Sequence, residues 1–465
     1  MACLNAVSWS IITPPFQVPD EPSHFAYTQL VAENQQLPSS SQTKYSPEEE
    51  AILADLKAVQ LQARPGLSSI SSSQEQQTLE KHLNMHLSRS GSGRVGGAGS
   101  GPPLYYLLET IPYGLASAGT LLDQLESMRL LSALMGGLTA LFVFLFLRET
   151  LPETPRAWTV GGLCAALTPL LGFIAGAVNP DAMLFAVSAA IFYCLARAFR
   201  RGLDRKLAVV IGLLTAAGFL TKLNFIGLSP GVMLGLIVLS VRAARLDGRR
   251  AAFSSLGIAV AIAASPVLIY LLANALSNRP LLGIVSLTLH AQGHSILGGL
   301  SYIWQFYLPR LPGTSDYFPG LSTIRDLWFD KSIGYYGWLD TSFPPWVDNV
   351  ALIPAGLLAG LAVRGLFKAR SALRQSLVEI GVYSAMAVGL LVLIGASAYF
   401  NPNESIGFAE PRYLLPLLPL GAVMLTLAAR GAGRRWGAPV GAVIVVLFLA
   451  HDIFSQLLVV GRFYT

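Results

Sequence analysis

Two adjacent carboxylates, Asp20 and Glu21, lie in a proline-rich stretch, PPFQVPDEPSHF, that follows the first apolar segment of the chain. Prolines stop a helix and keep the backbone extended, so the pair sits on a stiff turn with His24 close behind. Carboxylates are costly near hydrocarbon, and a pair at a membrane boundary is therefore a candidate functional site. The alternative is a polar loop that only ends a helix.

Further charges occur at the predicted ends of apolar helices. Asp181 belongs to the turn Asn179-Pro180-Asp181, and Lys222 belongs to the turn TKLN. Together with His24, Asn179 and Asp181 are candidate substrate contacts of a cleft at this boundary. A lysine at the edge of two apolar helices needs a counter-ion, which could be a lipid phosphate or Asp181. The simpler alternative is that its ammonium group extends to water.

Arg412 and Tyr413 lie in the string EPRYLLP, at the start of a late apolar span. A guanidinium group can bind phosphate through two parallel hydrogen bonds, which makes Arg412 a candidate phosphate ligand. The structural alternative is an ion pair with Glu404 or Glu410.

A glycine-punctuated segment, KSIGYYGWLD at residues 331–340, ends in an acid and lies in a stretch rich in aromatic residues. It could form part of a cleft wall, with Trp338 and Asp340 as candidate substrate contacts. Aromatic side chains stack on sugar rings, but they also form belts at membrane interfaces, and the pattern alone leaves both open.

The composition indicates the class of protein that positions these residues. Hydrophobic residues make up 53% of the 465 residues and charged residues only 12%, and the mean hydropathy is +0.54. Several apolar stretches reach the length that crosses a bilayer as a helix, and strand alternation is absent. We therefore predict an all-α, polytopic membrane protein, with no nucleic-acid partner despite a net charge of +6.

Eleven apolar spans are predicted, and basic residues fill every second connection between them. More than half of the 32 Lys and Arg residues lie in five alternate short loops, which predicts that these loops are cytoplasmic. The spans cover residues 1–13, 129–147, 157–177, 182–197, 207–221, 224–241, 252–275, 349–366, 376–399, 412–429 and 437–460.

The opposite, extracytoplasmic side then holds two large segments, 13–128 and 276–348, together with the short polar turns described above. We predict a single membrane domain over residues 1–465. Within the first segment, Ser46 followed by Pro47 and three glutamates predicts a short amphipathic helix to about residue 62. Residues 87–101 read as a flexible Gly/Ser linker.

These strings, in this order, resemble a large bacterial family of uncharacterised polytopic membrane proteins for which the GT-C glycosyltransferase fold is predicted. The resemblance rests on PPFQVPDEPSHFAY, NPDA, TKLN, YYGWLD and PRYLLP, and the PDE-xx-H and Arg-Tyr-xx-Pro elements are its most specific parts. Family members commonly have Gln-Gly before the Arg-Tyr pair, where this chain has Glu410-Pro411. The implied fold is a GT-C-like bundle of about 11 transmembrane helices with two large extracytoplasmic loops.

The resemblance implies a glycosyltransferase of the bacterial cytoplasmic membrane that acts on its outer face in polysaccharide biosynthesis of the cell envelope. It would take a sugar from a polyprenyl-phosphate donor and pass it to a glycan, lipid or protein. Asp20 would be the catalytic base or the ligand of a divalent metal ion such as Mg²⁺ or Mn²⁺, with Glu21 beside it. Lys222, Arg412 and Tyr413 would bind the donor phosphate.

Two other classes remain open at this stage. A transporter or flippase for lipid-linked saccharides would share the apolar bulk and the phosphate-binding cations, but it would need a polar path through the spans. A non-catalytic envelope-assembly protein would need neither. The sequence contains no nucleotide-binding or zinc-hydrolase motif in the structural context that such a motif requires.

Cysteine-accessibility labelling tests the predicted topology. Single cysteines near Arg201, Arg249 and Arg370 should react only from the cytoplasmic side, because basic loops are retained there, whereas those near Ser90 and Ser315 should react only from outside. Labelling of the Arg249 loop from outside would contradict the arrangement.

Overall fold

The computed structural model describes residues 1–38, 44–62, 64, 66–91, 101–246, 249–277, 279, 281, 295–318, 320–400 and 410–465. All regular elements within these ranges are helical, apart from one isolated bridge between Tyr336 and Thr341. The prediction of an all-α chain is confirmed for this part of the protein. Part of the predicted 87–101 linker lies outside the described residues.

One apolar helix and several short helices come first: α1 (Ala2–Ile12), α2 (Glu21–Asn34), α3 (Pro47–Asp55), α4 (Ala58–Leu61), α5 (Ser73–Asn84) and α6 (Leu104–Leu115). A run of mostly long helices follows: α7 (Leu121–Thr150), α8 (Pro155–Ala166), α9 (Pro169–Ala175), α10 (Pro180–Arg201), α11 (Arg205–Thr221), α12 (Phe225–Leu246) and α13 (Arg249–Leu276).

The C-terminal part begins with four short elements: α14 (Ile296–Tyr307), α15 (Gly320–Arg325), the π-helix η2 (Asp326–Asp330) and α16 (Lys331–Ile333). It ends with α17 (Pro345–Lys368), α18 (Arg370–Gln375), α19 (Leu377–Phe400), the 3₁₀ helix η3 (Pro411–Leu417), α20 (Leu418–Gly431) and α21 (Gly437–Tyr464).

Seven helices within the described ranges are long and apolar enough to cross a membrane, and the pair α8 and α9 makes eight if it counts as one span. The seven are α7, α10, α13, α17, α19, α20 together with η3, and α21. Helices also occupy the remaining stretches predicted from the sequence, as α1, α11 and α12. The count of about eleven crossings stays a prediction.

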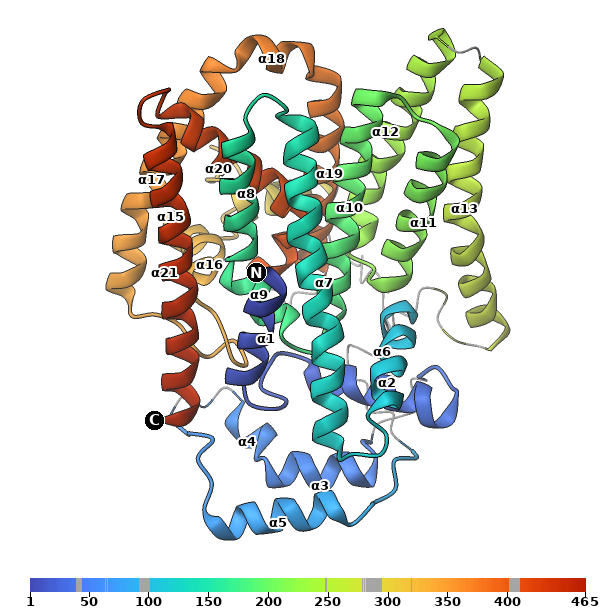
Figure 1. The fold of residues 1–465 in the computed structure, drawn as a ribbon, viewed down its shortest axis with the longest axis vertical. Helices are drawn as coiled ribbons and strands as arrows, with labels where there is room; N and C mark the ends of the chain where they lie inside the picture. The colour runs from blue at the N-terminus through green and yellow to red at the C-terminus, as the bar shows by residue number, and fades with distance from the viewer. Residues whose placement is uncertain are drawn as a thin grey trace.

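The span predicted over 157–177 is broken. The axes of α8 and α9 differ by 51°, and the break falls at Thr168, whose backbone is extended (φ −71°, ψ 113°) before Pro169. A proline disfavours helical geometry in the residue before it and offers no N–H to the preceding turn. The break turns α9 away from the line of α8 (Figure 1).

Helix α10 is the central helix of the bundle. In its most apolar window 83% of the residues are buried, against 6% for α13 and 11% for α17, which therefore lie at the periphery. It packs most extensively on α7 and also contacts α11 and α12, while α12 packs on α19 and α17 packs on α20. A site at the end of α10 is thus held by several neighbouring helices.

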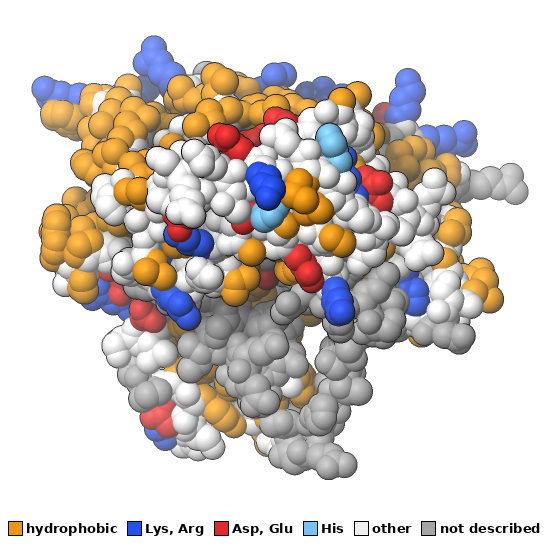
Figure 2. All heavy atoms as spheres, turned by 90° about the horizontal axis from the view of Figure 1, so that it is seen from below, with side chains coloured by type: hydrophobic (Ala, Val, Ile, Leu, Met, Phe, Trp, Pro, Cys, Tyr) orange, Lys and Arg blue, Asp and Glu red, His pale blue; other side chains and the backbone are white. Residues whose placement is uncertain are grey.

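The two ends of the bundle differ in composition. Figure 1 places α18, which carries Arg370 and Arg374, at the upper end, and α3 and α5 at the lower end. Figure 2 shows this lower end, with hydrophobic side chains gathered towards the left and upper edges and acidic and basic side chains scattered over the middle. The sidedness of the chain stays a prediction.

Helix starts depend on caps as much as on hydropathy. Helix α3 begins at the predicted place, with a capping box between Ser46 and Glu49, so the predicted start is confirmed. The predicted extension to about residue 62 was wrong, because α3 ends at Asp55 and the left-handed backbone of Lys57 (φ 52°) separates it from α4. Helix α7 begins at Leu121, eight residues before the predicted apolar span, because Thr120 and Asp123 form a second capping box. The first two turns of α7 thus belong to the segment 13–128 that was predicted as a loop.

A buried ion pair fixes the proline-rich turn against α7. The Arg129 guanidinium donates to Glu21 through Nε (2.8 Å) and Nη2 (2.7 Å), and neither side chain is exposed. Arg129 also donates to the carbonyls of Ser10 (3.0 Å), Thr13 (3.1 Å) and Pro14 (3.2 Å). One side chain of α7 therefore holds the end of α1 and the start of the turn.

Glu21 completes the anchor from the other side. Its carboxylate also accepts hydrogen bonds from the backbone N–H groups of Phe16 (2.9 Å) and Val178 (3.0 Å). The Val178 bond ties the turn to the segment just before α10. Each carboxylate oxygen is thus bonded twice, and the position of the neighbouring residue Asp20 is set by this network.

Substitutions of Glu21 test the anchor. Glu21→Gln leaves the Arg129 charge buried without its partner and should lower the free energy of unfolding by about 3–5 kcal/mol. Chemical unfolding of the detergent-solubilised protein measures this. The matched control is Glu126→Gln, because Glu126 also contacts Arg129 (3.3 Å) but is 48% exposed and should contribute below about 1 kcal/mol. Equal losses in the two variants would contradict an anchor at Glu21.

Candidate functional site

Four segments far apart in the sequence bring charged side chains to one place. They are the proline-rich turn with Asp20, the first turn of α10 with Asp181, the C-cap of α11 with Lys222, and the entry to η3 with Glu410 and Arg412. The opposite ends of α10 and α11 carry the basic residues Arg200, Arg201, Arg205 and Lys206. The cluster therefore lies at the far helix ends from those basic connections.

Arg412 is the centre of the cluster. Its Nη2 donates to Asp20 Oδ2 (3.2 Å) and to Glu410 Oε1 (3.3 Å), and its Nε pairs with the other Glu410 oxygen and lies 3.8 Å from Asp181 Oδ2. The guanidinium is buried, and its Nη1 has no hydrogen-bond partner among the described residues. The 3₁₀ geometry of η3, which contains Pro411 and Pro416, presents this side chain at the very start of the span.

Lys222 forms the second cationic position. Its Nζ donates to Asp181 Oδ1 at 2.7 Å, and it lies 5.3 Å from the ring centre of Tyr413. The Arg412 guanidinium lies at the same distance from that ring. The predicted counter-ion Asp181 is therefore in place, and Tyr413 contacts both cations through its ring.

Asp20 adopts a backbone conformation that few residues other than glycine adopt. Its φ of 67° is left-handed, and although it is the N-cap of α2, its side chain does not cap the helix. Asp tolerates this region better than most residues, but the geometry still costs energy and concentrates at functional positions. The carboxylate is instead directed at Arg412, and its side chain is 53% exposed, whereas those of Asp181 and Arg412 are 1% and 5% exposed.

The cluster shifts its carboxyl groups in opposite directions. Surrounding protein would raise the pKa of Asp20, but the charges of Arg412 and Lys222 outweigh it and hold that pKa below its ordinary value. Burial raises the pKa of Glu410, although Arg412 opposes this. Asp20 is therefore the ionised, accessible acid of the site at neutral pH.

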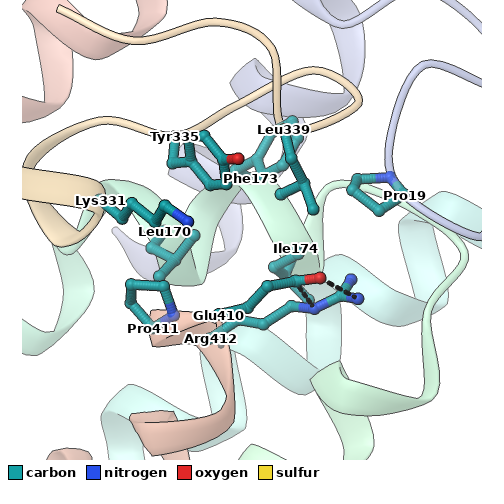
Figure 3. A pocket seen from close by; sticks show the side chains of 10 residues that line it. All are labelled: Pro19, Leu170, Phe173, Ile174, Lys331, Tyr335, Leu339, Glu410, Pro411 and Arg412. Atoms are coloured by element: carbon teal, nitrogen blue, oxygen red, sulfur yellow. Dashed lines mark hydrogen bonds and ion pairs between the residues drawn. The ribbon is translucent and has the colours of Figure 1, made fainter. Parts of the chain in front are cut away.

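A shallow hollow opens beside Arg412. Its lining is Pro19, Leu170, Phe173, Ile174, Lys331, Tyr335, Leu339, Glu410, Pro411 and Arg412. Figure 3 shows the Glu410 and Arg412 side chains along one side, with Lys331 and Tyr335 across from them. Helix α9 supplies an apolar wall, which it reaches because the chain turns at Thr168.

Residues of the segment 331–340 line this hollow as the sequence pattern indicated, but the lining uses Lys331, Tyr335 and Leu339. Trp338 donates through its ring N–H to the Phe16 carbonyl (3.1 Å) and so ties this segment to the proline-rich turn. The Asp340 side chain is 6% exposed and pairs with Arg462 of α21 (3.1 Å). Their predicted role as substrate contacts stays a prediction.

The other predicted residues lie beside the cluster with structural partners. Asn179 caps α10 by accepting from the Asp181 N–H (2.9 Å), and it donates to the Pro19 carbonyl (3.5 Å). It therefore links the two segments that carry Asp20 and Asp181. Glu21 is occupied by the anchor with Arg129, which distinguishes it from its neighbour Asp20.

His24 is buried one helical turn into α2. Its Nδ1 lies 2.9 Å from the Tyr106 hydroxyl of α6. Burial lowers the pKa of His24 to about 4, even though Asp20 opposes the shift. The imidazole is therefore neutral at pH 7 and is a hydrogen-bonding group of the packed core under the site.

Sequence reasoning missed Arg129 and Lys331. A charge inside an apolar helix demands a partner, so Arg129 was detectable as an unexplained cation, but no local pattern identifies Glu21, 108 positions away, as that partner. Lys331 begins the segment 331–340 that was predicted to form part of a cleft wall, but it was not itself predicted as a site residue. Glu410, considered only as a structural partner of Arg412, is a full member of the cluster.

The described residues do not offer a metal-binding set. No group of three or more His, Cys, Asp or Glu side chains suited to a metal ion occurs among them. Asp20 also faces two cations, which would repel a divalent ion. The predicted divalent metal ion does not fit these residues, and no step below depends on one.

The family model described as "Predicted membrane protein (DUF2142)" matches residues 3–421. The chain belongs to the DUF2142 family. No curated protein matches it.

Two solved structures of the Archaeoglobus fulgidus oligosaccharyltransferase are similar to this DUF2142 chain. One is the apo form, and the other is tethered with an acceptor peptide containing the NVT sequon via a disulfide bond. Each match has a TM-score of 0.45 and 12% identity and covers 99% of this chain. The match covers 55% of the apo structure and 54% of the tethered structure, so the chain spans about half their length.

The pKa of His24 generates a pH prediction. Between pH 6.5 and 4 the unfolded chain binds a proton at this histidine and the folded chain does not, so stability should fall as the pH falls through this window. The loss contributed by His24 should reach about 3 kcal/mol near pH 4. Denaturant unfolding at several pH values measures it. His24→Asn cannot titrate and should show a correspondingly smaller loss, and an unchanged loss in this variant would refute the assignment.

Proposed function

We propose that this chain is a GT-C-type glycosyltransferase that transfers a sugar from a polyprenyl-phosphate or polyprenyl-diphosphate donor to an acceptor hydroxyl group. The observation that supports this most is the convergence of Asp20, Asp181, Lys222 and Arg412 from four distant segments at the ends of apolar helices. A lipid-linked donor suits a membrane protein in which we detect no nucleotide-binding motif.

The two cations form the site for the donor phosphate. Lys222 is 24% exposed and reachable, and Arg412 has a buried Nη1 without a hydrogen-bond partner among the described residues. Among the three acids around Arg412, Asp20 is the exposed one. An arriving phosphate would therefore displace Asp20 from Arg412, while Asp181 continues to hold Lys222. Lys331, across the hollow, adds a third positive charge.

Displacement from Arg412 would free Asp20 to act as the catalytic base. In the structure Arg412 and Lys222 lower its pKa, and an acid held in this way accepts a proton poorly. When phosphate neutralises the two cations, the pKa of Asp20 rises towards its ordinary value. Donor binding would thus both release the carboxylate and make it a better base.

Transfer replaces one bond of the anomeric carbon by another. The bond between the anomeric carbon and the phosphate oxygen breaks, and its electron pair leaves with the phosphate. The acceptor oxygen bonds to the anomeric carbon, and its proton passes to Asp20. Arg412 and Lys222 stabilise the charge that grows on the leaving phosphate.

The setting of the reaction follows from the predicted topology. The cluster lies at the helix ends opposite the basic connections, which are expected to be cytoplasmic. We therefore place the site on the outer face of the bacterial cytoplasmic membrane, with a glycan, lipid or protein of the cell envelope as acceptor. The contacts of Trp338 with Phe16 and of Asp340 with Arg462 would hold the segment 331–340, which lines the hollow, in place beside the site.

Substitutions in the cluster separate chemistry from donor binding. Asp20→Asn should lower the rate of sugar transfer from a polyprenyl-phosphate donor in purified membranes by about 10²–10⁴-fold with donor binding retained. Lys222→Ala and Arg412→Lys should each weaken donor binding by about 10–100-fold, because each loses charge-assisted hydrogen bonds. Asp316→Asn, in an exposed ion pair with Arg310, is the matched control and should change neither.

A flippase predicts a different pattern. The two cation variants would then stop movement of the lipid-linked saccharide, and Asp20→Asn would do little. Full transfer activity in Asp20→Asn would eliminate the proposed mechanism, and absence of transfer in the wild-type chain together with lipid movement would eliminate the proposed function.

A further inference from the structure

A second lined groove lies at the other end of the bundle. It runs between the last turns of α10 and α12 and the start of α19, at the upper end in Figure 1, and has a volume of about 520 Å³. Phe199 comes from α10, and Arg242 and Arg245 come from the last turns of α12. This volume lies within the range of roughly 300–1,000 Å³ that is typical of small-molecule sites.

The groove has an apolar wall and two arginine side chains at one end. The apolar lining includes Ile237, Val241 and Val378, which are 45%, 41% and 54% exposed. Arg242 and Arg245 come after Ile237 and Val241 on α12, nearer to the end of the helix. Apolar side chains below cations at a helix end match the depth profile of a phospholipid, whose chains lie below its phosphate.

Neither arginine forms an ion pair within the described part of the chain. Arg242 lies over the Phe199 ring at 6.0 Å, which positions its guanidinium without neutralising it. The acid in the groove, Glu379, accepts a hydrogen bond from the Tyr383 hydroxyl at 2.7 Å. With both arginines and Glu379 ionised, the lining carries one net positive charge.

We propose that this groove binds an anionic phospholipid of the surrounding membrane. Its phosphodiester carries one negative charge, which complements the lining, and would bind Arg242 and Arg245. Hydroxyl groups of a head group such as that of phosphatidylglycerol would donate to Glu379 and to the polar residues Gln375 and Ser376. The acyl chains would cover the exposed apolar wall.

This site is separate from the proposed donor site. Phe199 and Asp181 lie near opposite ends of α10, 18 positions apart, which corresponds to about 27 Å of helix. The inference therefore does not depend on the proposed transferase activity. On the predicted topology the groove faces the cytoplasmic leaflet, where anionic lipids attract basic residues.

Native mass spectrometry of the full chain titrated with phosphatidylglycerol in detergent tests the proposal. Arg242→Gln and Arg245→Gln should each weaken binding about fivefold, as expected for one cation at an anionic lipid. The matched control is the double variant Arg434→Gln/Arg435→Gln, which removes two exposed arginines from the α20–α21 connection and should leave binding unchanged. An equal loss in the control would overturn the groove as the site.

Blocking the apolar wall tests the role of the acyl chains. Ile237→Trp keeps both arginines but fills the groove, so it should abolish lipid binding. If this variant does not fold, Val378→Trp fills the groove from the α19 side and should have the same effect. Phosphatidylethanolamine binding as tightly as phosphatidylglycerol would overturn the charge argument. Displacement of the lipid by an equal concentration of inorganic phosphate would show an anion site without a lipid and would also overturn the proposal.

Discussion

The buried ion pair between Arg129 and Glu21 is the constraint on which the candidate site depends. It joins the third turn of α7 to a turn that follows α1, and the Val178 N–H extends the same network to the segment just before α10. Breaking such a pair leaves an uncompensated charge in a dry environment, so the arrangement is held strongly in one geometry. Asp20 gains its position from this network and not from contacts of its own helix cap.

The cluster around Arg412 shows the opposite behaviour. Its carboxylates do not saturate its cations, because Arg412 retains a nitrogen without a hydrogen-bond partner within the described residues and Asp181 Oδ2 lies 3.8 Å from Arg412 Nε. Asp20 reaches the guanidinium from the exposed side through a single hydrogen bond. A rigid anchor beside an incompletely paired cluster suits a site in which one group must exchange partners when a ligand arrives.

The interrupted elements of the fold lie around this cluster. The break between α8 and α9 turns an apolar wall towards the hollow, and the 3₁₀ start of the penultimate span presents Arg412 there. Lys222 stands where α11 ends in extended geometry. Straight helices would direct these groups along the bundle, whereas helix ends and breaks allow side chains from several segments to meet at one point.

The sequence by itself determined the helical class, the positions of the apolar spans, and the acids and bases of the candidate site. Hydropathy and basic loops act over single segments, and the proline-rich turn and the capping box at Ser46 are local signals. Asp20, Asp181, Lys222 and Arg412 stood out because charge at the edge of an apolar helix needs a reason.

Only the tertiary structure decided which of these charges meet, and which of two adjacent acids is buried. Asp20 and Glu21 look equivalent in sequence, but the left-handed backbone at Asp20 turns its side chain to Arg412, while Glu21 points to Arg129. The break at Thr168 and the early start of α7 did have local signals, Pro169 and the capping box of Thr120 and Asp123, but hydropathy alone does not detect them. Ion pairs between residues 108 to 392 positions apart are set by helix packing, which no local pattern encodes.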